Sequence, residues 1–78
     1  MKKLIEYIVK LIVDDKDKVQ VEERAVGENM YNYIVKTVKD DTGKVIGKEG
    51  KIIHAIRNVA KVLAIKEGKQ IRIEVGET

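Results

Sequence analysis

The positions of apolar and polar residues predict a helix and then a hairpin in the first half of the chain. An amphipathic helix is expected over residues 2–14, because apolar side chains recur there at helical spacing: Leu4, Ile5, Ile8, Leu11 and Ile12. Residues 19–26 alternate in polarity, and residues 31–38 are rich in β-branched and aromatic side chains, both of which are typical of strands. Residues 27–29 offer turn chemistry between these strands.

The second half of the chain predicts two helices and a third strand. A short helix is expected over residues 41–46, capped by Asp40 or Asp41 and stopped by Gly47. A longer helix follows from Gly50 and ends before a glycine at position 68. Its expected core stripe is Ile52, Ile53, Ile56, Val59, Ala60 and Leu63. The alternation in residues 70–75 then places Ile71, Ile73 and Val75 on one face of a strand.

The order of these elements, α-β-β-α-α-β, predicts an α+β fold in which a three-stranded sheet carries helices packed on one face. Arg72 and Glu74 support a sheet covered on one side only, because they make the other face of the last strand polar. A chain of 78 residues supports one hydrophobic core at most. Residues 1–78 are therefore expected to form a single domain.

The composition argues against catalysis. The sequence contains no Cys, no Ser and one His, which removes thiol and serine nucleophiles, disulfides and Cys-based zinc sites. We expect no enzymatic activity, no metal and no cofactor. Glu6 and Lys10 interrupt the apolar N-terminal stretch, so neither a signal peptide nor a membrane span is predicted, and the expected location is the cytoplasm.

The net charge of +3 is concentrated in one short segment. Acids and bases cancel in residues 1–26, and they also cancel when residues 27–43 and 58–78 are taken together. The whole excess lies in residues 44–57, which hold four bases and one acid: Lys44, Lys48, Lys51, Arg57 and Glu49. Such a patch indicates an anionic partner, with a solvated basic helix face as the alternative.

Gly47 and Gly50 stand three residues apart inside this segment. They fit neither the phosphate-binding loop of nucleotide hydrolases, where Glu49 would replace the required hydroxyl, nor the dinucleotide fingerprint, where Val45 would replace a glycine. What remains is a G-x-x-G loop between two helices. Glycine lets a ligand backbone approach closely, and the positive end of the following helix favours a phosphate.

The segment from Val45 to Ile53, read as V-I-G-K-E-G-K-I-I, resembles the core of the KH domain, an RNA-binding module written V-I-G-x-x-G-x-x-I. Every fixed position matches. The element order covers essentially the whole chain and resembles the type II KH arrangement. Residues 41–47 and 55–57 are similar to the small bacterial single-KH proteins of the KhpA family.

This resemblance implies an RNA-binding protein without catalytic activity. A KH groove holds about four single-stranded nucleotides, with the G-x-x-G loop clamping the phosphate backbone beside an apolar floor. Single-stranded RNA is the expected partner, with single-stranded DNA as the alternative ligand. The resemblance further implies a homodimer, or a heterodimer with a larger KhpB-like KH-containing protein. It also implies post-transcriptional regulation or RNA chaperoning connected with cell shape and cell division.

The candidate RNA-binding residues lie in and beside the loop: Lys44, Ile46, Gly47, Lys48, Glu49, Gly50, Lys51, His54 and Arg57. Lys48 and Lys51 are expected to contact phosphates, because lysines beside loop glycines have little to pack against. Lys44 and Arg57 either contact RNA or form helix-face ion pairs. His54 either hydrogen-bonds RNA or faces water.

The groove around the loop leaves several alternatives open. Val45 and Ile46 either form its floor or belong to the core, and the second strand would supply the far wall through Ile34 or Lys36. The carboxylate of Glu49 repels phosphate, so we expect weak binding with modest sequence preference. Core or sheet-surface positions are expected for the three tyrosines, Tyr7, Tyr31 and Tyr33.

The competing hypothesis is a KH module used mainly for protein–protein assembly, with RNA binding weak or lost. Its interface would be the helix over residues 1–14 or the surface formed by Ala55, Val59 and Val62 on the long helix. The intact glycines argue against a complete loss of RNA binding.

Overall fold

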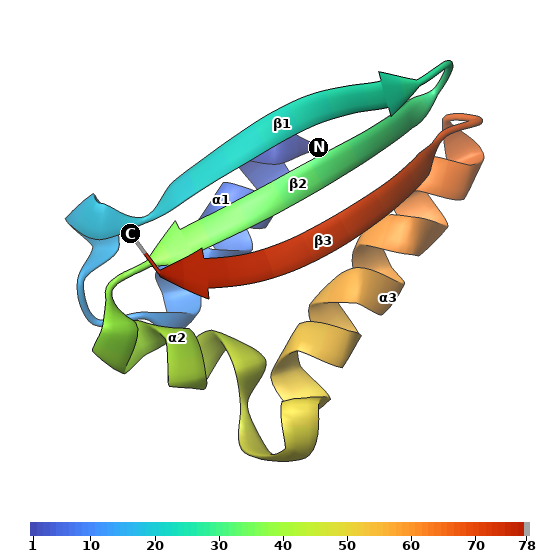
Figure 1. The fold of residues 1–78 in the computed structure, drawn as a ribbon. Coiled ribbons are helices and arrows are strands. Elements are labelled where there is room, and N and C mark those ends of the chain that lie inside the picture. Colours follow the sequence, from blue (N-terminus) through green and yellow to red (C-terminus); the bar gives the residue numbers. More distant parts are fainter. Residues whose placement is uncertain (78) are drawn as a thin grey trace.

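The computed structural model describes residues 1–77, with Thr78 outside the described part of the predicted domain. Three helices and three strands follow the predicted order (Figure 1): α1 (Lys2–Ile12), β1 (Gln20–Gly27), β2 (Met30–Thr37), α2 (Lys39–Ile46), α3 (Lys51–Lys66) and β3 (Gln70–Glu77). Two short 3-10 turns, Lys16–Lys18 and Lys48–Gly50, add to the predicted elements.

The sheet has the order β1-β2-β3, with β2 in the centre. Strands β1 and β2 form the predicted antiparallel hairpin, in which Val21 pairs with Val35. Strands β2 and β3 are parallel, and Val35 pairs with Val75. A parallel pair needs a long crossover connection, which α2 and α3 provide. The crossover leaves β3 at the edge of the sheet beside α3 (Figure 1).

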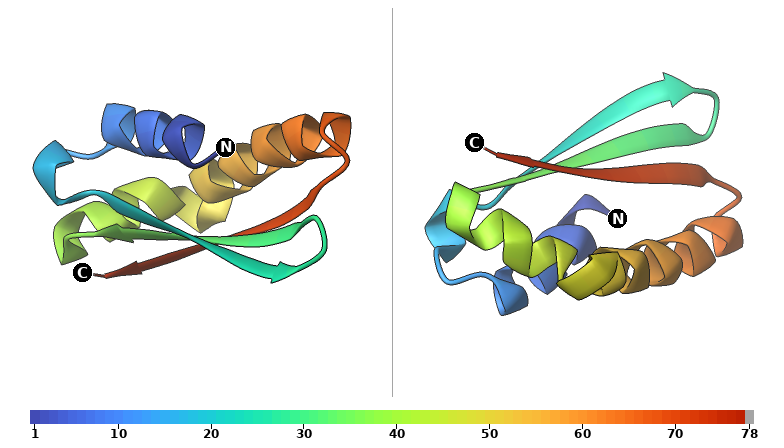
Figure 2. Two further views of the ribbon diagram at one scale, coloured as in Figure 1. Left: turned by 90° about the horizontal axis from the view of Figure 1, so that it is seen from above. Right: turned by 60° about the horizontal axis from the view of Figure 1, so that its bottom comes forward.

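All three helices lie on one face of the sheet, as predicted, so the molecule has two layers (Figure 2). The core lies between the layers and combines residues of α1, the inner face of the sheet, and α3: Ile5, Val9, Val21, Tyr33, Val35, Ile53, Ile56, Ala60 and Ile73. Ile71 and Val75 pack against this core, while Arg72 and Glu74 are exposed on the other face. The alternation predicted for the third strand is therefore confirmed.

The core stripe of α3 is narrower than the sequence suggests. Ile52 is 37% exposed and Val59 is 51% exposed, although both were expected in the core. Ala64, which was not predicted, is buried. The helix packs beside the edge of the sheet, so only the positions repeating every three or four residues from Ile53 face inward. Leu63, also expected in the core, is half-buried, and the other apolar side chains of α3 stay on its surface.

The expected aspartate cap of the short helix is wrong. Helix α2 begins at Lys39 with Val38 as N-cap and without a side-chain capping bond. Asp41 lies within the first turn, where its buried carboxylate accepts hydrogen bonds from the backbone N–H groups of Asp15 (2.9 Å) and Asp14 (3.3 Å). Asp41 therefore fastens the loop after α1 to α2 instead of capping α2.

Candidate nucleic-acid interface

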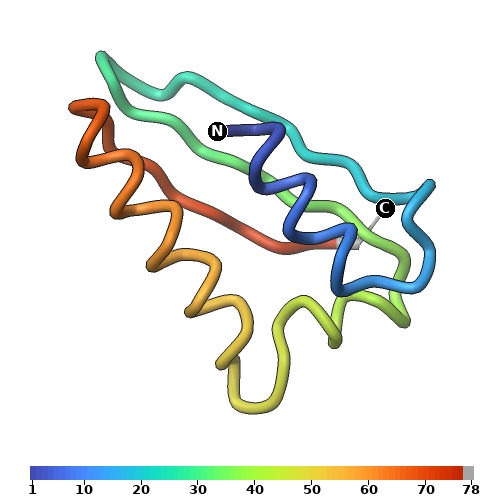
Figure 3. Tube along the Cα trace, turned by 180° about the vertical axis from the view of Figure 1, so that it is seen from behind, coloured from blue at the N-terminus to red at the C-terminus, as the bar shows by residue number. Residues whose placement is uncertain are grey.

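The G-x-x-G loop projects at one end of the molecule, between α2 and α3 (Figure 3). Three of its residues have positive φ angles: Gly47 (75°), Glu49 (57°) and Gly50 (74°). The N–H of Gly50 donates to the carbonyl of Gly47 at 3.1 Å, which closes the turn. The chain thus reverses direction within four residues and presents its backbone to solvent.

Gly47 is required by packing as well as by backbone conformation. A Cβ atom at this position would lie 2.6 Å from Cγ1 and 2.8 Å from Cβ of Ile52. At Gly50 a Cβ would meet only the His54 ring, at 3.6 Å. The first glycine therefore lets the loop pack closely on α3, whereas the second serves the turn itself.

Lys48 and Lys51 flank the loop with uncompensated charge. Both are exposed, and within residues 1–77 neither forms an ion pair or a side-chain hydrogen bond. Glu49 is also exposed and lies between them. Helix α3 starts at Lys51 with no acidic residue in its first turn and no side-chain cap. Its N-terminal amide groups and dipole therefore favour an anion next to these two lysines.

His54 and Ile46 lie beside the same loop. The His54 ring is exposed and approaches Gly50 from the first turn of α3. Ile46 ends α2 and is 38% exposed, so it forms an apolar surface next to Gly47. Five of the predicted positions, 47–51, thus form one exposed basic turn with Ile46 and His54 on its flanks.

The structure places Lys44 away from this turn. Its ammonium group pairs with the Asp14 carboxylate and lies 3.8 Å from Oδ1 of Asp41. The hydrogen bond to Asp14 raises the pKa of Lys44. The charge of Lys44 is therefore already compensated by carboxylates on the side of α2 that faces the loop after α1.

Val45 takes the core position that was one of its two alternatives, whereas the far wall expected from Ile34 or Lys36 is wrong. Val45 is fully buried and belongs to the core, so it cannot form a groove floor. Ile34 and Lys36 alternate with the inward-facing Val35, which places them on the sheet face opposite the helices. Lys36 binds Glu22 there at 2.9 Å, which lowers the pKa of that carboxyl. Strand β2 is central in the sheet, and the strand beside α3 is the edge strand β3.

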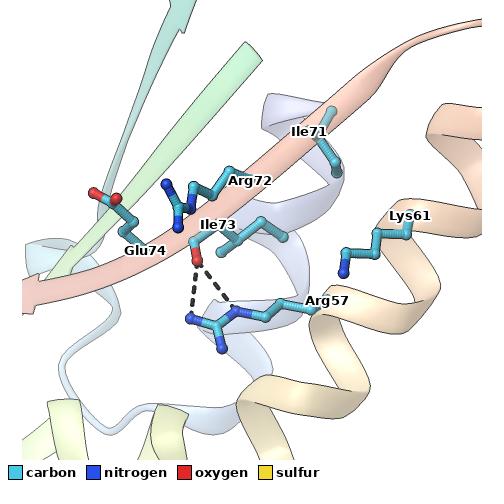
Figure 4. A pocket seen from close by; sticks show the side chains of 6 residues that line it. All are labelled: Arg57, Lys61, Ile71, Arg72, Ile73 and Glu74. Carbon is cyan, nitrogen blue, oxygen red and sulfur yellow. Dashed lines mark hydrogen bonds between the residues drawn. The ribbon is translucent and has the colours of Figure 1, made fainter. Parts of the chain in front are cut away.

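A cleft of about 560 Å³ lies between α3 and β3 (Figure 4). Arg57 and Lys61 extend into it from α3, and the strand contributes Ile71 to Glu74. The Arg57 guanidinium donates to the Ile73 carbonyl from Nε (3.2 Å) and Nη2 (3.0 Å). Sequence reasoning found Arg57 but missed Lys61 and the strand. The spacing of Arg57 and Lys61 on one helix face was the only available signal.

No tyrosine lines this cleft, so none is placed to stack on a base there. Tyr33 is buried, and this burial raises the pKa of its phenol. Tyr31 lies on the same inner face, 5.4 Å from the Lys69 ammonium group to the ring centroid. Tyr7 is exposed on α1, so the expected core or sheet-surface position is wrong for this residue alone.

A second, apolar groove of about 360 Å³ runs between α1 and α3. Its lining combines both helices: Ile8, Ile12, Lys51, Ile52, Ala55, Ile56 and Val59. The groove forms because apolar residues on the outer side of α3, such as Ile52 and Val59, are not buried in the core.

Comparison with known proteins identifies the family of this chain. The family model described as "KhpA/KhpB, KH domain" matches residues 2–75. The chain belongs to this family. The α-β-β-α-α-β order with a parallel β2-β3 pair is its type II KH arrangement.

Three relatives of this KhpA/KhpB chain are each named RNA-binding protein KhpA. The protein from Clostridium acetobutylicum is 47% identical and the one from Clostridium perfringens 45%, with 96% of this chain and 99% of each relative covered. The protein from Aquifex aeolicus is 36% identical, with 99% of this chain and 96% of the relative covered. No solved structure matches the chain. Within residues 1–77, no helix is long and apolar enough to cross a membrane.

Proposed function

We propose that this KH domain binds single-stranded RNA without catalysis, with the G-x-x-G turn clamping the phosphate backbone. The observation that carries the proposal is the exposed pair Lys48 and Lys51, uncompensated within residues 1–77, beside the uncapped N-terminus of α3. The names of the relatives support RNA as the nucleic acid. From the turn, the bound RNA continues into the cleft between α3 and β3.

The test is binding of a short, unstructured, labelled RNA across a salt series. About three neutralised phosphates give a log–log slope near −2 for a single strand. Replacement of both Lys48 and Lys51 by Gln is expected to weaken binding and to reduce the slope by about 0.7 per lysine. A matched control is Lys66→Gln, which removes an exposed charge about 22 Å along the same helix.

The control variant should bind like the wild type. Equal losses in all variants would mean that RNA is attracted by general charge, and the clamp would then be rejected. A folded wild-type chain that binds no RNA at low salt would reject the proposed function itself. A parallel series with DNA of the same sequence tests the alternative ligand.

A second candidate function is assembly with another KH chain through the apolar groove between α1 and α3. The exposed side chains that line it, Val59 among them, have no partner layer within residues 1–77. Val62 follows Val59 by one helical turn and is 57% exposed. We expect a second copy, or a larger KhpB-like protein, to cover this surface.

Sedimentation velocity on the wild type and on Val59→Glu tests this assembly. The wild type is expected to form dimers that the variant loses, because a carboxylate in an apolar interface has no partner. Val26→Glu is the matched control, since Val26 is similarly exposed on β1. A wild type that remains monomeric at all concentrations would rule out the homodimer, and added KhpB-like protein then tests the heterodimer.

A further inference from the structure

The backbone of β3 has one open edge, which forms a wall of the cleft beside α3. The N–H of Gln70 donates to Asn29 at 2.8 Å, so residue 70 directs its backbone groups toward the β2 side. Backbone direction alternates along a strand. Ile71, Ile73 and Val75 therefore turn their N–H and C=O groups to the open edge, where Arg57 reaches Ile73.

Arg57 occupies the acceptor at the middle of this edge. Its Nε and Nη2 both donate to the Ile73 carbonyl, and no other hydrogen bond of Arg57 forms within residues 1–77. A guanidinium has five N–H donors in one plane, so the two on Nη1 and the second on Nη2 stay available. The carbonyl holds the plane in a fixed orientation that a mobile lysine would not have.

The α3 side of the cleft therefore carries hydrogen-bond donors. Arg57 offers its remaining N–H groups, and Lys61 extends from the next turn of α3 toward the strand (Figure 4). Arg72 and Glu74 also line the cleft, with side chains that extend from the side of β3 away from α3 in the same view. The cleft volume of about 560 Å³ falls within the usual range of small-ligand sites, roughly 300–1,000 Å³.

We propose that this cleft selects a nucleobase edge with two adjacent hydrogen-bond acceptors, and that Arg57 sets the selection. The proposal rests on the RNA binding proposed above and specifies the base at that site. Cytosine offers O2 and N3, and guanine offers N7 and O6. Adenine and uracil alternate donors and acceptors along their edges. At Ile73, an adenine amino group would meet a carbonyl that already accepts two hydrogen bonds from Arg57.

The experiment measures binding of labelled oligoribonucleotides of equal length by fluorescence anisotropy at one salt concentration. The probes are oligo(C), oligo(A), oligo(U) and an alternating U-G sequence. The wild type is expected to bind oligo(C), or the U-G sequence, about tenfold more tightly than oligo(A) and oligo(U). The oligo(C) and U-G arms distinguish cytosine from guanine.

Arg57→Lys keeps the charge but removes the planar fork, so its affinity for the preferred probe should fall about tenfold, to the level of the other probes. Its preference among the four probes should disappear. Lys66→Arg is the matched control, because it makes the reverse exchange on the same helix at an exposed residue that does not line the cleft. This control should retain the preference. Thermal unfolding verifies that each variant is folded, and the wild-type probes alone still test the selection if Arg57→Lys unfolds.

Wild-type binding that is equal for all probes, or tightest for oligo(A) or oligo(U), would overturn the selection. A preference that survives in folded Arg57→Lys would overturn the role of Arg57. Failure to bind any probe would instead reject RNA binding as a whole, so the two failures can be told apart.

Discussion

Replacing Gly47 with Ala should destabilise the protein far more than the same change at Gly50. At Gly47 the backbone has φ 75° and ψ 174°, a region that is essentially restricted to glycine. The added Cβ would also lie 2.6 to 2.9 Å from three side-chain atoms of Ile52. One of these is the Ile52 Cβ, which is attached directly to the α3 backbone, so a change of rotamer cannot relieve the contact.

The magnitude follows from these two causes. Backbone strain of this kind costs about 1–3 kcal/mol, and overpacking costs about as much again. We expect Gly47→Ala to lose about 2–4 kcal/mol in the free energy of unfolding. The loss is smaller than the full sum because movement of the exposed Ile52 side chain relieves the contacts of Cγ1 and Cδ1, although not that of Cβ. Gly50 has φ 74° and ψ 14°, and only the His54 ring is near. Gly50→Ala should therefore cost about 1–2 kcal/mol.

Gly43 provides an internal control within the same segment. It lies inside α2, and a Cβ there would meet nothing within 4 Å. Gly43→Ala should gain about 0.5–1 kcal/mol, since alanine restricts the unfolded chain and favours the helix. The three variants therefore differ in sign and size although each adds one methyl group.

Circular dichroism measures the free energy of unfolding of all three variants in urea and their melting temperatures on heating. For a domain of this size, each kcal/mol shifts the melting temperature by about 4–8 °C. The melting temperature should fall by roughly 10–25 °C for Gly47→Ala and rise by a few degrees for Gly43→Ala. If Gly47→Ala is no less stable than Gly50→Ala, the close approach of the loop to Ile52 does not govern this turn and the reasoning is refuted.

Three further outcomes are expected. Backbone hydrogen bonds from Asp15 and Asp14, with help from Lys44, hold the pKa of Asp41 below its ordinary 3.8. The contribution of the Asp41 carboxylate to stability is therefore present above pH 4 and is lost as the pH falls through the lower folded-state pKa. In pH-dependent urea unfolding, Asp41→Asn should be less stable at neutral pH and lose less on acidification, and an unchanged acid dependence would contradict this. Glu49→Gly should raise the melting temperature and tighten RNA binding, because it relieves the left-handed backbone (φ 57°) and removes the carboxylate beside the lysines; looser binding of the folded variant would count against the clamp. Ala64→Leu should cost about 1–3 kcal/mol in denaturant unfolding because the site is fully packed, whereas Ile65→Leu on the exposed side of α3 should be nearly neutral; equal costs would mean that the α3 packing is wrong.

The local pattern of the sequence determined the elements and the loop. Periodicity is a property of neighbouring residues, so alternation around Ile73 and the helical repeat before Ile12 were sufficient to place strands and helices. The motif from Val45 to Ile53 likewise lies within one short segment. Its two glycines have the positive φ angles that such a turn requires.

The tertiary structure alone decided how much of each apolar face is buried and which strand borders α3. Periodicity does not say how wide a stripe the neighbouring layer covers, so Val59 was assigned to the core although α3 lies too close to the sheet edge to bury it. The parallel crossover placed β3 beside α3, which brought Arg57 to the Ile73 carbonyl, 16 residues away. The Asp41 carboxylate accepts hydrogen bonds from the backbone N–H groups of Asp15 and Asp14, which lie 26 and 27 residues earlier in the chain. Contacts between residues so far apart in the sequence depend on how the helices pack on the sheet, so the spacing of neighbouring residues does not predict them.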